Sequence, residues 1–164
     1  DLPTFEGYAG ETVSILYQLA AMILNGGSEV ETGDAAGHLG VAHALIGHLR
    51  SFGFNASHGR IFLPASIFAA NGVIEGEIFS GTISEGLVAA QAQLIDLAEE
   101  HLARADEAIA LLSPRLRPAF AAVALLRAYL KLAPAHSETP FAPPPEIADW
   151  RRIVLLGWWA WRQR

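Results

Sequence analysis

The fold is decided by the stretch that runs Leu39-Gly40-Val41-Ala42, then His48-Leu49-Arg50-Ser51-Phe52-Gly53-Phe54-Asn55, and ends on Gly59-Arg60-Ile61-Phe62-Leu63-Pro64. Apolar residues recur in its first part at helical spacing, which predicts a helix over 35–51 with one inner face. That face carries Leu39, Ala42, Leu45, Ile46 and Leu49. We expect an irregular loop over 52–64, closed by Pro64.

This pattern resembles the signature of the squalene/phytoene synthase family. In that family a helix reading L-G-x-A-L-Q-L-T-N-I-L-R-D-V-G-E-D is followed by a G-R-[IV]-[YF]-L-P segment. The acidic D-V-G-E-D cluster falls on residues 51–55, where this chain has Ser-Phe-Gly-Phe-Asn and none of the carboxylates. The family's Gln and Asn fall on Ala44 and Gly47.

A second element, Asp1-Leu2 to Ala9-Gly10, looks like the family's D-L-Y-x-Y-C-x-x-V-A-G segment. One interpretation places Tyr8 or Glu11 along an isoprenoid tunnel. We favour the other, in which Ala9 and Gly10 are small so that two helices can pack closely.

The resemblance implies an all-α helical bundle of the isoprenoid-synthase type with about five to seven helices. It corresponds to the C-terminal part only, so we expect residues 1–164 to be one partial domain and a shortened piece of a longer protein. Family members hold Mg²⁺ through two aspartate-rich motifs, and the metal neutralises the substrate diphosphate. Ser51 and Asn55 offer only neutral oxygens, so we predict no catalytic residue, no metal ligand and no cofactor. Mg²⁺ would be required only if the chain were an active enzyme.

Composition supports a protein with a large core. Hydrophobic residues make up 52% and charged residues 17% of the 164 residues. The absence of cysteine excludes disulfides and thiolate chemistry. The net charge of −6 argues against a nucleic-acid partner, which needs a basic face. No apolar run reaches the roughly eighteen residues of a membrane span.

The remaining helices are predicted from periodicity and from Gly and Pro punctuation. We expect helices over 7–24, 83–112 and from about 114 to 132, with short turns at 64–70 and 75–79. The inner face of the first should carry Val13, Leu16, Tyr17, Ala20 and Ile23 or Leu24. The inner stripe of the longest should carry Leu87, Leu94, Ala98, Ala105, Ile109 and Leu112. A proline-rich linker, 134–145, precedes a terminal helix over 146–162.

Candidate ligand-binding residues follow from the family resemblance. Arg50 and Arg60 match family positions and could contact a diphosphate or another anion, together with Ser51, Asn55 and Tyr8. We favour the simpler interpretation, in which Arg50 stabilises its helix end and Arg60 packs within the loop. The acidic run Asp96, Glu99 and Glu100 is interpreted as a solvated face, with Glu100 and Arg104 paired. The spacing of His38, His43 and His48 spreads them around one helix, which argues against a metal trio.

The tail holds all four tryptophans, together with several arginines. Trp150, Trp158, Trp159 and Trp161 could meet a membrane interface or a protein partner. In the alternative, which we slightly favour, the terminal helix closes the bundle and leaves Trp158 or Trp159 partly exposed.

Two functions are compatible with the sequence. The first is a non-catalytic synthase-like protein that binds an isoprenoid, another lipid-like ligand or a protein partner. One family branch that lacks the acidic motifs serves in respiratory complex I assembly, and this chain is similar to it. The second is an active prenyltransferase that condenses two isoprenyl diphosphates head to head. We expect a cytoplasmic protein, peripheral to the inner membrane, whose apolar surface a second copy could cover to form a homodimer.

Overall fold

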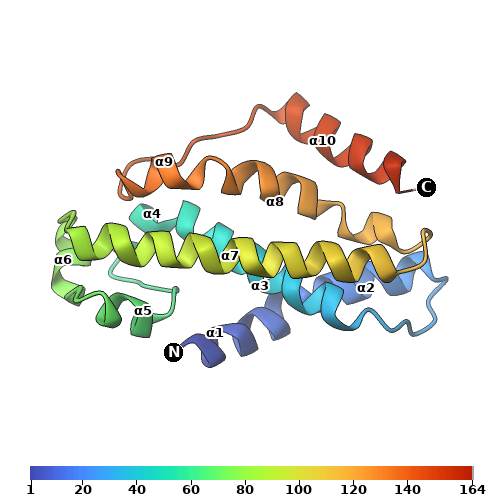
Figure 1. Cartoon of the computed structure of the whole chain (residues 1–164), viewed down its shortest axis with the longest axis horizontal. Coiled ribbons are helices and arrows are strands. Elements are labelled where there is room, and N and C mark those ends of the chain that lie inside the picture. The colour runs from blue at the N-terminus through green and yellow to red at the C-terminus, as the bar shows by residue number, and fades with distance from the viewer. Residues whose placement is uncertain (164) are drawn as a thin grey trace.

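The computed structural model describes residues 1–163, which are 72% helical and contain no strand. Figure 1 shows long helices lying side by side, with the chain ends on opposite sides of the bundle. If the first three helical segments count as one continuous helix, the described residues hold five helices of seven residues or more. The predicted all-α bundle is therefore confirmed.

The first helix is longer than predicted and is interrupted by a π-helical turn. It consists of α1 (Leu2–Ala9), the π turn Gly10–Ser14 and α2 (Ile15–Leu24). The π turn holds one extra residue, which rotates the following helix by about 100° relative to a continuous α-helix. The buried positions are consequently Phe5, Ala9, Ser14, Tyr17 and Ala21.

The predicted inner face of this helix is confirmed only in part, because Tyr17 is buried and Val13, Ala20 and Leu24 are half-buried. Leu16 and Ile23 are exposed, and so are their neighbours Ile15 and Leu19. The prediction assumed one uninterrupted α-helical period, whereas the π turn moves the inner face forward by one residue from Ser14 onward.

The centre of the bundle is the pair α3 (Gly33–Arg50) and α7 (Glu85–Leu111). Every predicted inner residue of α3 is buried, and so is each one on α7 from Leu87 to Ile109; Leu112 packs against the core from its edge. Ser84 caps α7 by accepting a hydrogen bond from the Leu87 amide at 3.3 Å. The side-chain periodicity predicted from the sequence is confirmed for both helices.

The closest helix approach involves Gly40 and not Gly10. A Cβ atom on Gly40 would lie 2.0 Å from Ser14 Oγ and 2.8 Å from Ser14 N, whereas a Cβ on Gly10 would meet nothing within 4 Å. Ala9 is fully buried, as expected for a packing residue. The prediction of close packing therefore holds for Ala9 and is wrong for Gly10.

The stretch after α3 is more helical than predicted. The short helix α4 (Phe52–Ser57) forms where we expected an irregular loop, because Phe52 and Ala56 share a helical face and both pack into the core. The short turns were predicted well and form α5 (Ala65–Ala70) and α6 (Glu75–Ser80).

The region after α7 starts its next helix later than predicted. Arg117 reaches back and donates hydrogen bonds to the carbonyls of Leu112 and Ala110, at 2.9 and 2.8 Å, so it caps the end of α7. A 3₁₀ turn at Arg117–Phe120 contains Pro118, and α8 (Ala122–Leu130) begins beyond it. Pro118 has no backbone N–H, so it cannot donate to a carbonyl of the preceding turn, and this favours the later start of α8.

The segment predicted as a proline-rich linker is partly helical and well packed. Helix α9 (Ala133–Ser137) covers its beginning, Pro140 is fully buried, and Phe141 stacks near Phe52 with ring centroids 5.5 Å apart. Only residues 143–148 run without helix or turn before α10 (Asp149–Arg162), which begins three residues later than predicted. Figure 1 shows α8 between α10 and α7.

None of the helices in residues 1–163 is long and apolar enough to cross a membrane.

Candidate functional site

A groove between α3, α8 and α10 is the main candidate site. It has a volume of about 620 Å³, which is within the range of small-molecule sites in proteins. Most of its lining is apolar, and five charged or titratable side chains lie along it. The lining residues are His43, Ile46, Gly47, Arg50, Ala122, Leu125, Leu126, Tyr129, Asp149, Arg152, Ile153 and Leu156.

Arg50 lies at the end of α3 and joins the groove to the chain that leads into α10. Its guanidinium donates a hydrogen bond to Glu146 Oε1 at 2.6 Å and lies 3.8 Å from the centre of the Tyr129 ring. The ion pair is partly open to solvent, so screening limits its strength. Because Glu146 already neutralises Arg50, this arginine offers an incoming anion less than a free guanidinium would.

A second polar pair lies at the wall of the groove. Tyr17 and His43 are joined by a hydrogen bond of 2.8 Å between the phenol oxygen and Nδ1. Burial raises the pKa of Tyr17, so the phenol stays protonated, and the tautomer of His43 decides which of the two groups donates. Partial burial lowers the pKa of His43, whose ring borders the open groove. The pair is therefore neutral near pH 7 and suits an uncharged ligand.

The two neutral residues at the family's acidic positions bond to their own helix. Asn55 Nδ2 donates to Ser51 Oγ at 3.0 Å, and Ser51 Oγ donates to the Gly47 carbonyl at 2.9 Å. Arg60 follows at the surface, with its side chain exposed and its amide donating to the Asn55 carbonyl at 3.0 Å. The structure places Arg50, Ser51 and Asn55 along the end of α3 and its continuation, and Arg60 outside the groove.

Tyr8 lies on a different side of α3 from Arg50. Its ring packs near His48 and Phe5, with centroids 6.1 and 6.3 Å away, and it is half exposed. His48 and Arg50 are two residues apart on one helix, so their side chains point in nearly opposite directions. Tyr8 is therefore not brought together with the other candidate ligand residues.

The tryptophans of α10 divide between two faces. Trp150, Trp158 and Trp161 are exposed on the outer face with Val154, while the exposed Ile153 lies at the edge of the groove. Trp159 faces inward and packs against the core. Two arginines stack on the outer indoles, Arg151 on Trp150 and Arg162 on Trp158. The outer face combines an apolar stripe with cations, while Trp159 holds the helix to the bundle.

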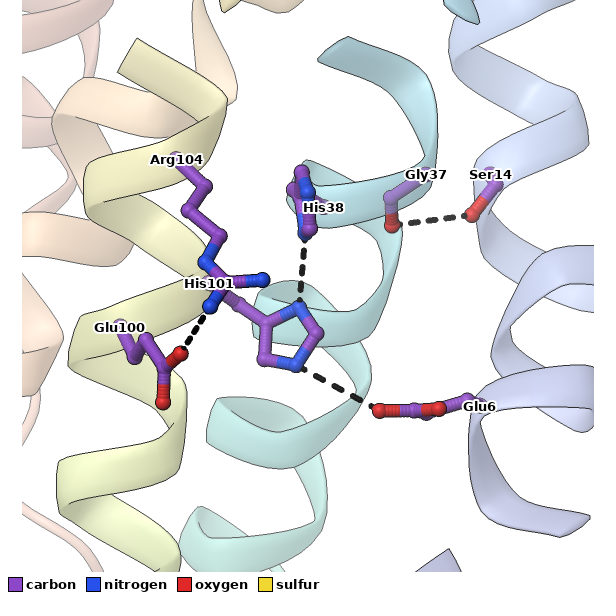
Figure 2. A network of polar contacts seen from close by, with 7 residues as sticks. All are labelled: Glu6, Ser14, Gly37, His38, Glu100, His101 and Arg104. Atoms are coloured by element: carbon purple, nitrogen blue, oxygen red, sulfur yellow. Dashed lines mark hydrogen bonds and ion pairs between the residues drawn. The ribbon is translucent and has the colours of Figure 1, made fainter. Parts of the chain in front are cut away.

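A second polar cleft, of about 470 Å³, lies between α1, α3 and α7 (Figure 2). His38 Nδ1 and His101 Nδ1 are 3.1 Å apart, and Glu6 Oε1 lies 3.6 Å from His101 Nε2 on the other side of that ring. Figure 2 shows Glu100 bonded to Arg104 beside this group, which confirms the predicted pair.

The histidines of α3 each have a separate neighbour. His38 contacts His101, His43 contacts Tyr17, and His48 stacks on Phe62. Within residues 1–163 no group of three or more His, Asp or Glu side chains is placed to hold a metal ion. The predicted lack of a metal ligand stays a prediction, because carboxylates outside this chain could contribute.

Sequence reasoning missed three residues beside the groove: Tyr129, Glu146 and Gln91. Glu146 and Tyr129 meet Arg50 from distant parts of the chain, and no local pattern announces such contacts. Gln91 does carry a signal, since it lies on the apolar stripe of α7 between Leu87 and Leu94 and is only 2% exposed. A polar residue on a core stripe indicates a polar partner inside the protein.

Comparisons with known proteins place these observations in context. The family model described as squalene/phytoene synthase matches residues 1–159. The 15-cis-phytoene synthase of Synechococcus elongatus is 29% identical over 119 residues, which cover 72% of this chain and 39% of that protein. Phytoene synthase 1 (chloroplastic) of Solanum lycopersicum is 27% identical over 124 residues, covering 75% and 30% of the two chains.

A relative with a different name matches over the full chain. The NADH dehydrogenase (ubiquinone) complex I, assembly factor 6, of Bos taurus is 28% identical over 164 residues, covering 100% of this chain and 49% of that protein. In each of these comparisons the chain spans less than half the length of the relative.

Proposed function

This chain belongs to the squalene/phytoene synthase family, and on that premise we propose that it is a non-catalytic member that binds an isoprenoid-type lipid between α3, α8 and α10. The single observation that carries this proposal is the lack of a carboxylate at residues 51–55, directly after α3. Ser51 and Asn55 occupy the positions at which the family resemblance implies carboxylates, and they hydrogen-bond to each other. Neutral oxygens do not supply the charge that holds Mg²⁺ against a diphosphate.

The carboxylates nearest the groove support the same conclusion. Glu146 pairs with Arg50 at 2.6 Å, and Asp149 pairs with Arg152 at 3.2 Å. Each is therefore partly neutralised, and neither lies at the positions that correspond to the acidic cluster. The apolar lining of the groove suits a hydrocarbon chain, whose burial contributes about 25 cal/mol per Å² of apolar surface.

We also propose that α10 touches a membrane surface. Its exposed indoles with neighbouring arginines suit the boundary between acyl chains and anionic headgroups. A lipid ligand could then enter the groove directly from the bilayer, because α10 borders both the groove and the outer surface.

We further propose that the chain acts together with a protein partner. The match to the complex I assembly factor extends over the whole chain, while the phytoene synthase matches cover 72–75% of it. This supports a function in respiratory complex I assembly, in which the chain acts by binding and not by catalysis.

The second candidate is an active head-to-head prenyltransferase, favoured by the matches to phytoene synthases. In that case Arg50, Arg60 and Asn55 would contact the diphosphate, and Mg²⁺ would be held by carboxylates elsewhere in the full-length protein.

One titration separates the candidates. The full-length protein is titrated with a non-hydrolysable farnesyl diphosphate analogue, once in a buffer that contains Mg²⁺ and once in a buffer that contains EDTA. The binding proposal predicts the same affinity in both buffers and no product from farnesyl diphosphate. Tight binding that depends on Mg²⁺, together with turnover, would refute it in favour of the prenyltransferase.

A further inference from the structure

A small chamber adjoins the groove, and most of its lining is apolar. It is enclosed by α3, α7, α8 and α9 and has a volume of about 20 Å³, enough for one group the size of a water molecule. Ile46, Arg50 and Tyr129 line both the chamber and the groove, so the two cavities share a wall.

Three nitrogen atoms of the chamber wall lack a partner. They are Arg50 Nε, Gln91 Nε2 and His136 Nε2, and among residues 1–163 they are the buried side-chain polar atoms without a hydrogen bond. Gln91 is the most enclosed of the three, at 2% exposure. A buried polar atom without a partner is costly, so three such atoms on residues that line one chamber favour an occupant that bonds to them.

The chemistry of these atoms specifies that occupant. Arg50 Nε and Gln91 Nε2 carry hydrogens and can only donate. Burial and the neighbouring Arg50 charge lower the pKa of His136, so its ring is neutral near pH 7 and Nε2 can accept. A single hydroxyl group has the matching capacity, because its oxygen can accept two hydrogen bonds and its hydrogen can be donated to His136.

We propose that the chamber binds the hydroxyl group of a prenyl alcohol or a similar lipid alcohol, whose hydrocarbon chain lies in the groove. This inference rests on the proposed function and assigns the polar end of its ligand. Gln91 and His136 are then binding residues that the family resemblance does not mark.

Other polar ends fit less well. A diphosphate is far larger than the chamber, and the outward side of Arg50 is already paired with Glu146. An ether oxygen accepts but cannot donate, which leaves His136 Nε2 without a partner when that atom is the acceptor. A water molecule satisfies the same three atoms, so the experiment must separate a resident water from a ligand hydroxyl.

The test compares farnesol with farnesyl methyl ether by calorimetric titration of the full chain. The two probes share one hydrocarbon chain and differ at the oxygen. We expect farnesol to bind roughly 3- to 10-fold more tightly than the ether, the range expected for one buried hydrogen bond. Gln91→Met keeps the side-chain length and removes the donor, so it should abolish most of this difference.

Gln93→Met is the matched control, because Gln93 lies two residues further along α7, is exposed, and bonds Asn71 at 3.0 Å outside the chamber. It should bind farnesol like the wild type. His136→Phe, on a separate helix, should reduce the preference for farnesol in the same way as Gln91→Met, so the test does not depend on one variant folding.

The outcomes distinguish the two levels of the proposal. Equal binding of both probes, or an unchanged preference in Gln91→Met and His136→Phe, would mean that the chamber holds only water and would overturn this inference. If neither probe binds, the proposed lipid-binding function itself fails.

Discussion

Replacing Gly40 with alanine should destabilise the bundle, because this glycine allows α3 to approach the π turn. The new Cβ would lie 2.8 Å from Ser14 N and 2.9 Å from Ser14 Cα, in addition to 2.0 Å from Ser14 Oγ. Rotation of the Ser14 side chain can relieve only the last contact. The two backbone contacts force the helices apart, which disturbs the packing of Ala9 and Leu39 nearby.

Gly47→Ala provides the matched control on the same helix. A Cβ at Gly47 meets nothing within 4 Å, so this variant shows the gain in helix propensity alone, up to about 1 kcal/mol. Overpacking in a well-packed core costs about 1–3 kcal/mol, and the backbone clash puts Gly40→Ala in the upper half of that range. We therefore expect the free energy of unfolding of the Gly47→Ala variant to be about 2–3 kcal/mol higher than that of the Gly40→Ala variant.

Urea denaturation followed by circular dichroism measures this difference. The corresponding gap in melting temperature should be roughly 4–12 °C for a chain of this size. If the two variants were equally stable, the close approach of α3 to the π turn would not exist as described, and the explanation of the altered helix face would lose its support.

Three further predictions follow from separate contacts. Gly53→Ala should lower the free energy of unfolding by about 1–3 kcal/mol, because its Cβ would lie 2.7 Å from the Phe141 backbone; Gly76→Ala, with nothing within 4 Å, should not. The free energy of unfolding should fall as the pH drops below 6.5, because four histidines have a lower pKa in the folded state than the 6.5 of the unfolded state, so the unfolded state binds more protons; they are His43, His48, His101 and His136. A melting temperature that rises when the pH is lowered from 7 to 5.5 would contradict this. Trp158→Ala should weaken flotation with anionic liposomes and change the melting temperature by no more than about 1 °C. Trp159→Ala should lower the free energy of unfolding by about 1–3 kcal/mol and the melting temperature by several degrees. Equal effects of the two variants on stability would contradict the division of the tryptophans between two faces of α10.

The inner faces that the sequence predicts best belong to helices that pack against a neighbouring helix along their whole length. The inner residues of α3 and α7 repeat at regular helical spacing because each is a continuous α-helix and the two face each other. The first helix fails this rule, since periodicity cannot reveal an inserted residue and the π turn shifts its inner face at Ser14. Short helices such as α4 and α9 form because tertiary packing fixes them, which local propensity does not report.

The candidate site follows the same division. Arg50, Ser51 and Asn55 could be placed on one helix end because they are close in sequence and match a known pattern. The partners that decide their chemistry could not be predicted, because Glu146 lies ninety-six residues from Arg50 and approaches it through the fold. Among the distant residues, Gln91 is the one that the sequence indicates, because it is a polar residue on the otherwise apolar stripe of α7.

The attachment of α10 has a consequence for which ligands the groove can accommodate. The helix hangs on residues 143–148, which run without helix or turn, and none of its side chains from Asp149 to Arg162 is fully buried. Detaching it breaks far fewer apolar contacts than unfolding the bundle, so its amides should exchange with solvent at a lower free energy than those of α3 and α7. If the groove binds the proposed lipid, a helix held this loosely can move outward or inward to accommodate hydrocarbon chains of different thickness. Discrimination between hydrocarbon chains of different length would then be poor, and selectivity would depend on the side of the groove that α3 and α8 form.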